Sequence, residues 1–322
     1  MNNMFLKLEK TLFFFILYYV ESFCISTLSD EDLNTVSLYY YSPSHISEQI
    51  IGPNTTLIDF ASDLPTKLII HGYIAHRNHG SVEPVKNAYL GRGDTNVILA
   101  DWEQLAHKLY DESRSYVRQI GVRVGALLSV YIKNQNVTFD DIHVVGHSLG
   151  AHIAGNVGRH FDGQLSRITG LDPAAPLFTN LSIDAIKQSD GQFVDIIHTG
   201  GYSLGEIWTR GHVDFYPNSG IFHQPGCRKD DLLTLFSCSH FRAPLYFAES
   251  ILLPNSFVAV KCTFKDILSD TPNKCANSVE TVFMGDIVPK EYATAFARGT
   301  YYLTTNEVYP FGRGNYSQFG IL

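Results

Sequence analysis

The sequence lacks several features that would point to a particular class of protein. Only 17% of its 322 residues are charged, and the formal net charge is -8. No basic excess is available to attract nucleic acid or an anionic membrane, so we expect no nucleic-acid partner. The five cysteines form no C-x-x-C pair, the usual spacing of a zinc site. No repeat, charge block or linker divides the chain, and a hydrophobic content of 45% suits one globular unit with a large core.

The N-terminal hydrophobic run is too short to cross a membrane. The run LFFFILYYV, Leu12 to Val20, falls below the ~20 residues that a bilayer requires. Lys7 and Lys10 precede it and polar residues follow, which is typical of a secretory signal peptide; a buried core strand is the alternative. We expect residues 1–24 to be cleaved off, leaving residues 25–322 as one secreted, extracellular domain.

The remaining cysteines and several asparagines fit a secreted chain. An even set of four cysteines suggests disulfides, and of the three possible connectivities the two local pairs are the simplest. These pairs are Cys227 with Cys238 and Cys262 with Cys275. Asn-x-Ser/Thr sequences are candidate glycosylation sites. They start at Asn54, Asn136, Asn180 and Asn315.

Short apolar runs rich in β-branched residues recur along the chain. Such runs suit strands buried on both faces, as in a parallel sheet covered by helices. Apolar residues at helical spacing in 115–134 separate two of these runs. The order predicts an α/β fold, a mostly parallel central sheet flanked by helices, with reactive groups at the carboxyl ends of the strands. The expected strands lie in residues 67–73, 96–102, 142–148, 167–173 and 193–199.

The run IHVVGHSLGAHIAGNVGR, residues 142–159, places Ser148 between an expected strand and an expected helix. A G-x-S-x-G match alone is weak, but this context is the one that a nucleophile elbow requires. Gly146 and Gly150 carry no Cβ where the strained turn brings strand and helix together. Ser148 is therefore a candidate nucleophile; the alternative is an ordinary strand-to-helix turn.

A serine hydroxyl is a poor nucleophile and needs a general base, itself held by an acid. In α/β-hydrolases these residues follow in the order Ser, Asp or Glu, His. Asp172 directly follows an expected strand and precedes Pro173, which bends the chain away from sheet or helix. Asp172 thus fits the orienting acid, with Asp195 and Asp214 as competing carboxylates.

The general base is harder to choose, since the sequence holds thirteen histidines. His240 is the strongest candidate, because a disulfide at Cys238 would restrain the loop that carries it. An oxyanion hole would use the main-chain N–H of Leu149 and that of Tyr73 in IIHGY, although HGY alone could be a plain turn. Spacing leaves three other histidines open: His198, His212 and His223.

Ordered motifs give the chain a resemblance to the pancreatic lipase family, which belongs to the α/β-hydrolases. The resemblance covers most of residues 25–322 and implies Ser148, Asp172 and His240 as the triad, with Tyr73 and Leu149 as oxyanion donors. It thereby selects His240 among the histidines. The motifs are HVVGHSLGAHIAG, GLDPAAPLF, FVDIIHT, GHVDFYPN, PGC, CSHFRAP, VFMGD and GTYYLTTN.

Two departures from pancreatic lipases narrow the expected activity. The chain ends where their C-terminal β-sandwich domain would begin, so we expect no such domain. The segment between Cys227 and Cys238 and the one between IIHT and GHVDFYPN are short, which resembles secreted phospholipases A1 such as those of wasp venom. We therefore expect a phospholipase A1 that releases the sn-1 fatty acid from phospholipids at a membrane or micelle interface. Triacylglycerol lipase or galactolipase activity is the alternative, and a yolk-protein-like lipid carrier is a rival of another class.

The resemblance also raises questions about the lid and about calcium. The short segment between Cys227 and Cys238 corresponds to the lid of these lipases. Leucines and a phenylalanine follow RKDD in this lid, and they would either enter a lipid interface or pack over the active-site rim. Of two acidic calcium ligands in pancreatic lipase, one matches Asp190 but the other position holds Lys187. We therefore expect no metal and no other cofactor. The lid residues are Leu232, Leu233, Leu235 and Phe236.

Overall fold

The computed structural model describes residues 27–44, 47–228, 232–269, 275, 278, 280–287 and 298–314, without the side chains of residues 232 and 233. The expected signal peptide, residues 1–24, and Asn315 lie outside the described residues. The helices are α2 (Asp30–Asn34), α3 (Glu83–Arg92), α4 (Glu103–Ala106), α5 (Tyr110–Ser115), α6 (Val117–Gln135), α7 (Leu149–His160), α8 (Leu232–Leu252) and α9 (Phe264–Leu268), with short 3-10 turns η1 (Phe139–Asp141), η2 (Gln188–Asp190) and η3 (Asn218–Gly220).

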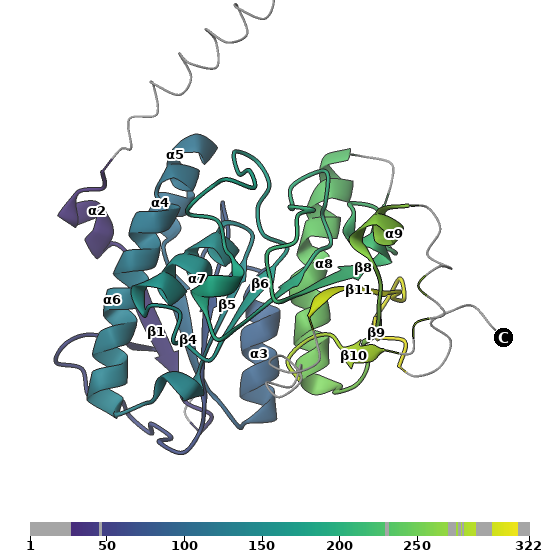
Figure 1. Ribbon diagram of the computed structural model, residues 1–322. Helices are drawn as coiled ribbons and strands as arrows, with labels where there is room; N and C mark the ends of the chain where they lie inside the picture. The colour runs from purple at the N-terminus through teal and green to yellow at the C-terminus, as the bar shows by residue number, and fades with distance from the viewer. Residues whose placement is uncertain are drawn as a thin grey trace, which may run out of the picture.

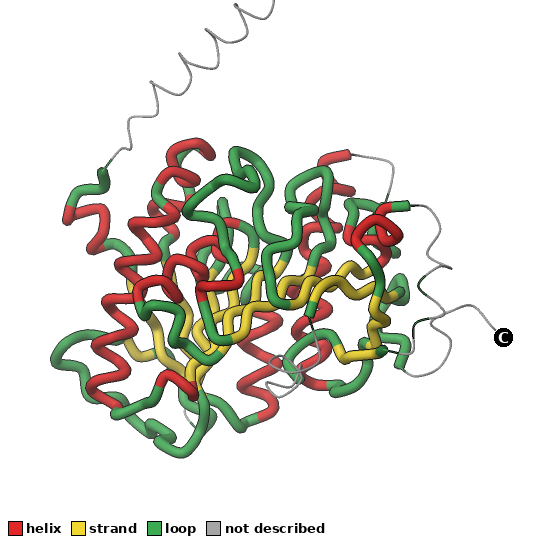
Figure 2. The backbone as a smooth tube through the Cα atoms, viewed as in Figure 1, coloured by secondary structure: helices red, strands yellow, loops and turns green. Residues whose placement is uncertain are grey.

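The strands form one sheet across the molecule, seen as the yellow band in Figure 2. Their order is β10-β9-β11-β8-β7-β6-β5-β3-β4-β1-β2. The central strands, from β4 to β11, run parallel, while β1 and β2 at one edge and β9 and β10 at the other pair in antiparallel fashion. The strands are β1 (Ser37–Tyr41), β2 (Gln49–Ile50), β3 (Thr66–Ile70), β4 (Asn96–Asp101), β5 (Ile142–His147), β6 (Arg167–Leu171), β7 (Phe193–Ile197), β8 (Val213–Pro217), β9 (Val258–Lys261), β10 (Thr281–Phe283) and β11 (Gly299–Leu303).

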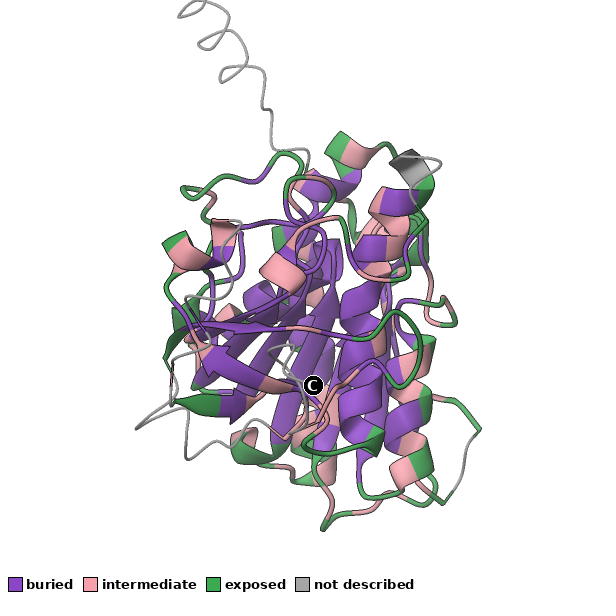
Figure 3. Cartoon of the chain, turned by 90° about the vertical axis from the view of Figure 1, so that its right-hand side faces the viewer, coloured by how far each residue is buried: buried purple, intermediate pink, exposed green. Residues whose placement is uncertain are grey.

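Helices cover both faces of this sheet (Figure 1). Successive side chains of a strand point to opposite faces. In β3, Leu68 and Ile70 pack in the cluster that includes Val124 of α6, whereas Ile69 packs in the cluster that includes Phe247 of α8. The central strands are therefore buried on both sides, as the predominance of purple in Figure 3 shows. This layering confirms the predicted α/β-hydrolase fold.

The predicted central elements occur where the sequence placed them. β4, β5, β6 and β7 lie within their expected ranges, and β3 begins one residue before its expected range. Helix α6 matches the expected helix at 115–134 to within two residues. Among the described residues, no helix is both long and apolar enough to span a bilayer. The carboxyl ends of β3, β5 and β6 lie side by side because these strands are parallel neighbours. Ser148 and Asp172 each come directly after one of these ends.

Candidate active site

Ser148 lies in the turn between β5 and α7, as predicted. Its backbone has φ 59° and ψ -125°, a conformation that costs a non-glycine residue energy and is concentrated at functional sites. A Cβ at Gly146 would overlap the main chain of Gly150, and a Cβ at Gly150 would overlap the carbonyl oxygen of His71. The two glycines therefore allow β5, β3 and α7 to approach closely enough to form the strained turn.

Asp172 is fully buried at the end of β6, in the left-handed region with φ 44°. Its Oδ1 accepts hydrogen bonds from the main-chain N–H groups of Thr199, at 2.8 Å, and Gly200, at 2.9 Å. Its Oδ2 lies 2.5 Å from Nδ1 of His240. Main-chain donors thus fix one oxygen and leave the other to orient the imidazole.

His240 lies inside helix α8, so the expectation that a loop carries it is wrong. Pro244 four residues later argues against a helix in the sequence, because proline removes an N–H and kinks helices. The predicted disulfide between Cys227 and Cys238 is present and ties the first turns of α8 to the preceding segment. The second predicted disulfide, Cys262 with Cys275, is present as well. The base is therefore restrained by a helix and a disulfide together.

His147 compensates for Pro244, a role that the sequence analysis missed. The carbonyl oxygen of His240 would normally accept from the N–H of residue 244, which proline lacks. Nε2 of His147 lies 3.1 Å from this oxygen, and since a carbonyl only accepts, Nε2 carries the donated hydrogen. The rings of His147 and His240 lie 4.5 Å apart. Because His147 directly precedes Ser148, this bond connects the base to the nucleophile turn.

The two expected oxyanion donors lie on either side of Ser148. Leu149 is the first residue of α7, so its N–H has no partner within the helix. Within the described residues, neither this N–H nor that of Tyr73 donates to a main-chain carbonyl. A Cβ at Gly72 would lie 2.7 Å from Cβ of Ser148, so the segment before Tyr73 packs directly on the serine. Both N–H groups are available to an incoming oxygen.

A buried polar group that the sequence analysis also missed supports the Tyr73 segment. Nδ1 of His71 lies 3.0 Å from the carbonyl oxygen of Gly72, and its Nε2 lies 3.2 Å from Oδ1 of Asp101. Burial would raise the pKa of Asp101, but hydrogen bonds from His71 and Arg77 outweigh it and lower this pKa to about 2. A histidine directly after the apolar residues LII in KLIIHGY was the signal that could have indicated this contact.

The alternative candidates for the acid and for the base have other partners. Asp195 binds Arg167 through both carboxylate oxygens, at 2.9 and 2.8 Å. Asp214 accepts from Nε2 of His198 at 2.8 Å, so these two alternatives satisfy each other. Nδ1 of His212 accepts from the N–H of Val194, and the exposed His223 packs beside Phe222. None of the three alternative histidines contacts Asp172 through a hydrogen bond among the described residues.

Two of the four expected lid side chains pack against the protein. Leu235 is only 2% exposed, so it packs inside the protein in this conformation, and Phe236 packs edge-on against Phe222 with ring centres 4.9 Å apart. In this conformation both side chains therefore pack against the protein, as in the second of the two alternatives. The side chains of Leu232 and Leu233 lie outside the described part, and their interfacial role stays a prediction.

Asp190, which the resemblance matched to a calcium ligand, forms an ion pair. Both carboxylate oxygens of Asp190 lie 2.8 Å from the guanidinium of Arg159, and the N–H of Lys187 donates to Oδ2 at 2.8 Å. No cluster of three or more metal-ligating side chains occurs among the described residues. Three candidate glycosylation sites are exposed: Asn54, Asn136 and Asn180.

Comparisons with known proteins point to one family. The sequence profile of a family described as Lipase matches residues 25–311. Pancreatic triacylglycerol lipase of Myocastor coypus is 31% identical over 318 residues, which cover 89% of this chain and 68% of that protein. The horse enzyme, from Equus caballus, is 32% identical with the same two shares. Pancreatic lipase-related protein 2 of Mus musculus is 31% identical and covers 89% of this chain and 65% of that protein.

Proposed function

Since the chain belongs to the lipase family, we propose that it is a secreted hydrolase of lipid carboxylic esters in which Ser148 is the nucleophile, His240 the general base and Asp172 the orienting acid. The observation that carries the proposal is the 2.5 Å contact between Nδ1 of His240 and Oδ2 of Asp172, beside the strained Ser148 turn. A histidine held in this way presents Nε2 as the proton acceptor.

The proposed reaction proceeds through an acyl-enzyme. Nε2 of His240 takes the proton of Ser148 as the hydroxyl attacks the ester carbonyl, and the N–H groups of Tyr73 and Leu149 stabilise the tetrahedral oxyanion. The imidazolium then protonates the leaving alcohol. A water molecule, activated by the same imidazole, hydrolyses the acyl ester and releases the fatty acid. This chemistry needs neither a metal nor an organic cofactor.

We propose phospholipid as the substrate and phospholipase A1 as the activity. Only ten residues separate Cys227 from Cys238, and the segment between β7 and β8 is also short. Short loops reduce the apolar wall beside the serine, which favours a substrate with a polar head group. Triacylglycerol hydrolysis is the second candidate, since the similar proteins from Myocastor coypus and Equus caballus are triacylglycerol lipases by name. Galactolipid is a further alternative.

The substrate can be tested by product analysis. The purified protein is incubated with phosphatidylcholine carrying different acyl chains at sn-1 and sn-2, and in parallel with a triglyceride emulsion. Phospholipase A1 activity predicts release of the sn-1 acid and faster turnover of phospholipid than of triglyceride. Faster release from the emulsion would instead support the triacylglycerol alternative.

The nucleophile can be tested with Ser148→Ala, which removes only the hydroxyl. We expect hydrolysis to fall by at least a thousandfold while the thermal midpoint stays within a few degrees of wild type. The control Ser203→Ala removes a hydroxyl from the β7–β8 segment and should retain activity. A wild-type protein inert on every lipid ester would favour a lipid carrier.

A further inference from the structure

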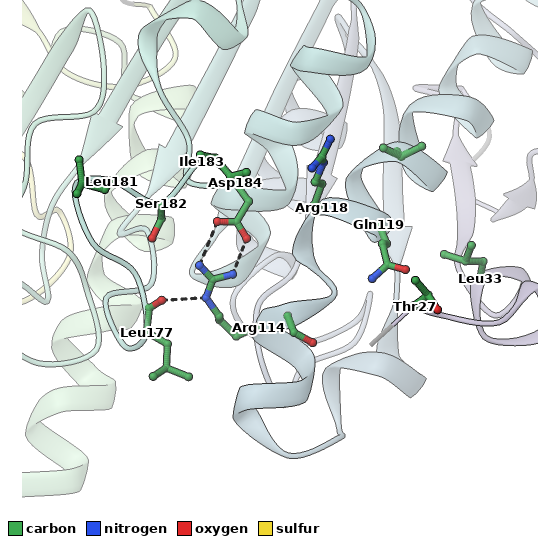
Figure 4. A pocket seen from close by; sticks show the side chains of 12 residues that line it. Thr27, Leu33, Arg114, Arg118, Gln119, Leu177, Leu181, Ser182, Ile183 and Asp184 are labelled. Atoms are coloured by element: carbon green, nitrogen blue, oxygen red, sulfur yellow. Dashed lines mark hydrogen bonds and ion pairs between the residues drawn. The ribbon is translucent and has the colours of Figure 1, made fainter. Parts of the chain in front are cut away.

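A pocket lies away from Ser148, between α2, the start of α6 and the segment after β6 (Figure 4). Its volume is about 930 Å³, and none of Ser148, Asp172 and His240 lines it. Small-molecule sites typically measure ~300–1,000 Å³, so the space suits one ligand of moderate size. The apolar side chains around it are Leu33, Val122, Leu177, Leu181 and Ile183.

An ion pair holds the wall of this pocket in place. The guanidinium of Arg114 contacts both carboxylate oxygens of Asp184, at 2.5 and 3.0 Å, and its Nε donates to the carbonyl oxygen of Leu177 at 3.0 Å (Figure 4). The same guanidinium lies 3.7 Å from the ring centre of Phe178. The segment after β6 is therefore fixed to α5, and the negative charge of Asp184 is neutralised within the wall.

Arg118 provides the charge that remains at the pocket. Its side chain is exposed, and it has no hydrogen-bond or ion-pair partner among the residues that the structure describes. Leu181 is 90% exposed and Ile183 is 74% exposed on the facing segment. Exposed apolar side chains gathered around one site indicate a binding surface. The pocket thus combines an apolar wall with a single available guanidinium.

We propose that this pocket binds the anion of a long-chain fatty acid, with its carboxylate on Arg118 and its acyl chain along Leu181, Ile183 and Val122. The planar guanidinium matches a carboxylate through two parallel hydrogen bonds. The apolar side chains remove the acyl chain from water. Binding requires no turnover, so the inference goes beyond the proposed function and stands separately from it.

The test is photolabelling with a fatty acid that carries a diazirine on its acyl chain. The full secreted protein is irradiated with the probe below its aggregation concentration, digested and mapped by mass spectrometry. We expect label on peptides containing Val122, Leu181 or Ile183. Oleate should displace the probe, whereas oleyl alcohol, with the same chain and no charge, should displace it about tenfold less effectively.

Two variants separate the effect of the Arg118 charge from the effect of removing any cation from α6. Arg118→Gln should reduce labelling at this pocket about tenfold, while Lys133→Gln, an exposed cation at the other end of α6, should leave it unchanged. Thermal unfolding of each variant verifies folding. Ser148→Ala should label like wild type, so a failure of the proposed hydrolysis is distinguishable from a failure of this site.

Four outcomes would overturn the inference. Label confined to peptides around Ser148 and Tyr73 would place the acyl chain in the candidate active site alone. Equal displacement by oleate and oleyl alcohol, or equal labelling of Arg118→Gln, would show that no carboxylate is recognised. Displacement by anionic phospholipid vesicles but not by monomeric oleate would assign the pocket to a membrane surface.

Discussion

Asp172 and Asp190 both follow β6, but their surroundings differ. Asp172 is held by two main-chain N–H groups and keeps one oxygen for His240. Asp190 gives both oxygens to the guanidinium of Arg159. Burial raises the pKa of Asp190, and Arg159 opposes this shift. One carboxylate is therefore placed to orient an imidazole, and the other is used in a structural ion pair.

The ion pair predicts that activity does not depend on calcium. A cation at Asp190 would have to displace Arg159 and approach the ammonium-bearing Lys187. We expect EDTA to leave both the hydrolysis rate and the thermal midpoint unchanged, measured on a substrate whose own dispersion needs no calcium. A rate that falls in EDTA and returns with added calcium would contradict this prediction.

The hydrogen bond from His147 to the main chain of His240 predicts that His147 affects the rate of hydrolysis. His147→Phe keeps an aromatic ring but removes the hydrogen bond to the carbonyl oxygen of His240. We expect kcat to fall about tenfold with little change in KM, because a misplaced base slows chemistry more than binding.

A proline substitution provides the matched rescue. Pro244→Ala restores the N–H that normally bonds to the carbonyl of residue 240. The double variant His147→Phe with Pro244→Ala should therefore recover part of the lost kcat, whereas Pro244→Ala alone should stay close to wild type. Equal kcat in the single and double variants would show that this carbonyl bond does not position the base.

At the scale of whole elements, strands β3 to β7 were predictable, whereas β8 and β11 were not. β3 to β7 are rich in apolar and β-branched residues, which parallel strands buried on both faces require. β8 and β11 carry polar and aromatic residues. They pair although 81 residues, 218–298, lie between the end of β8 at Pro217 and the start of β11 at Gly299. Such long-range pairing leaves no local pattern in a sequence.

Helix α8 illustrates the same limit at the candidate site. A proline within the segment favours a break, yet the helix continues because His147, far away in the chain, supplies the missing hydrogen bond. The residue types and order of Ser148, Asp172 and His240 could be read from the sequence. The helical placement of the base depends on a tertiary contact, which the sequence does not reveal.

The burial of Leu235 and the interfacial role expected for Leu232 and Leu233 predict different effects for these neighbouring leucines. Leu235→Ser would place a hydroxyl at a buried position and should lower stability by about 3 kcal/mol, reducing hydrolysis of every substrate. Leu232→Ser with Leu233→Ser should mainly reduce hydrolysis of phospholipid vesicles and spare a soluble short-chain ester. Thermal melts and both assays separate the two cases. Equal losses on vesicles and soluble ester in the Leu232/Leu233 variant would defeat the interfacial role.

At the scale of the molecule, several histidines are buried in their neutral form. Burial lowers the pKa values of His143 and His147 well below the usual value, and lowers the pKa of His152 to about 4. The hydrogen bonds of His152 explain why its neutral ring does not bind a second proton. Its Nδ1 accepts from the N–H of Ile186 and its Nε2 donates to the carbonyl oxygen of Ala174, so a second ring proton would break the first bond.

These neutral histidines predict that stability falls in mild acid. An unfolded histidine binds a proton near pH 6.5, whereas folded His152 stays neutral until about pH 4. The unfolded state therefore binds more protons between these values, and the free energy of unfolding decreases as the pH falls through this window. His152 alone contributes a loss of about 2 kcal/mol between pH 7.5 and pH 5. His198 acts in the opposite direction: burial lowers its pKa, but Asp214 outweighs this and raises it, so its contribution is present below pH 6.5 and lost above.

Urea unfolding at pH 7.5 and pH 5, with the disulfides kept oxidised, measures this difference. His152→Gln should be less stable than wild type at pH 7.5, because it disturbs a buried, hydrogen-bonded ring, but it should lose about 2 kcal/mol less on acidification. His107→Gln changes an exposed histidine and should retain the wild-type pH dependence. If His152→Gln and wild type lost the same free energy between the two pH values, protonation of His152 would not contribute. The acid sensitivity would then come from the other histidines with lowered pKa values, among them His143 and His147.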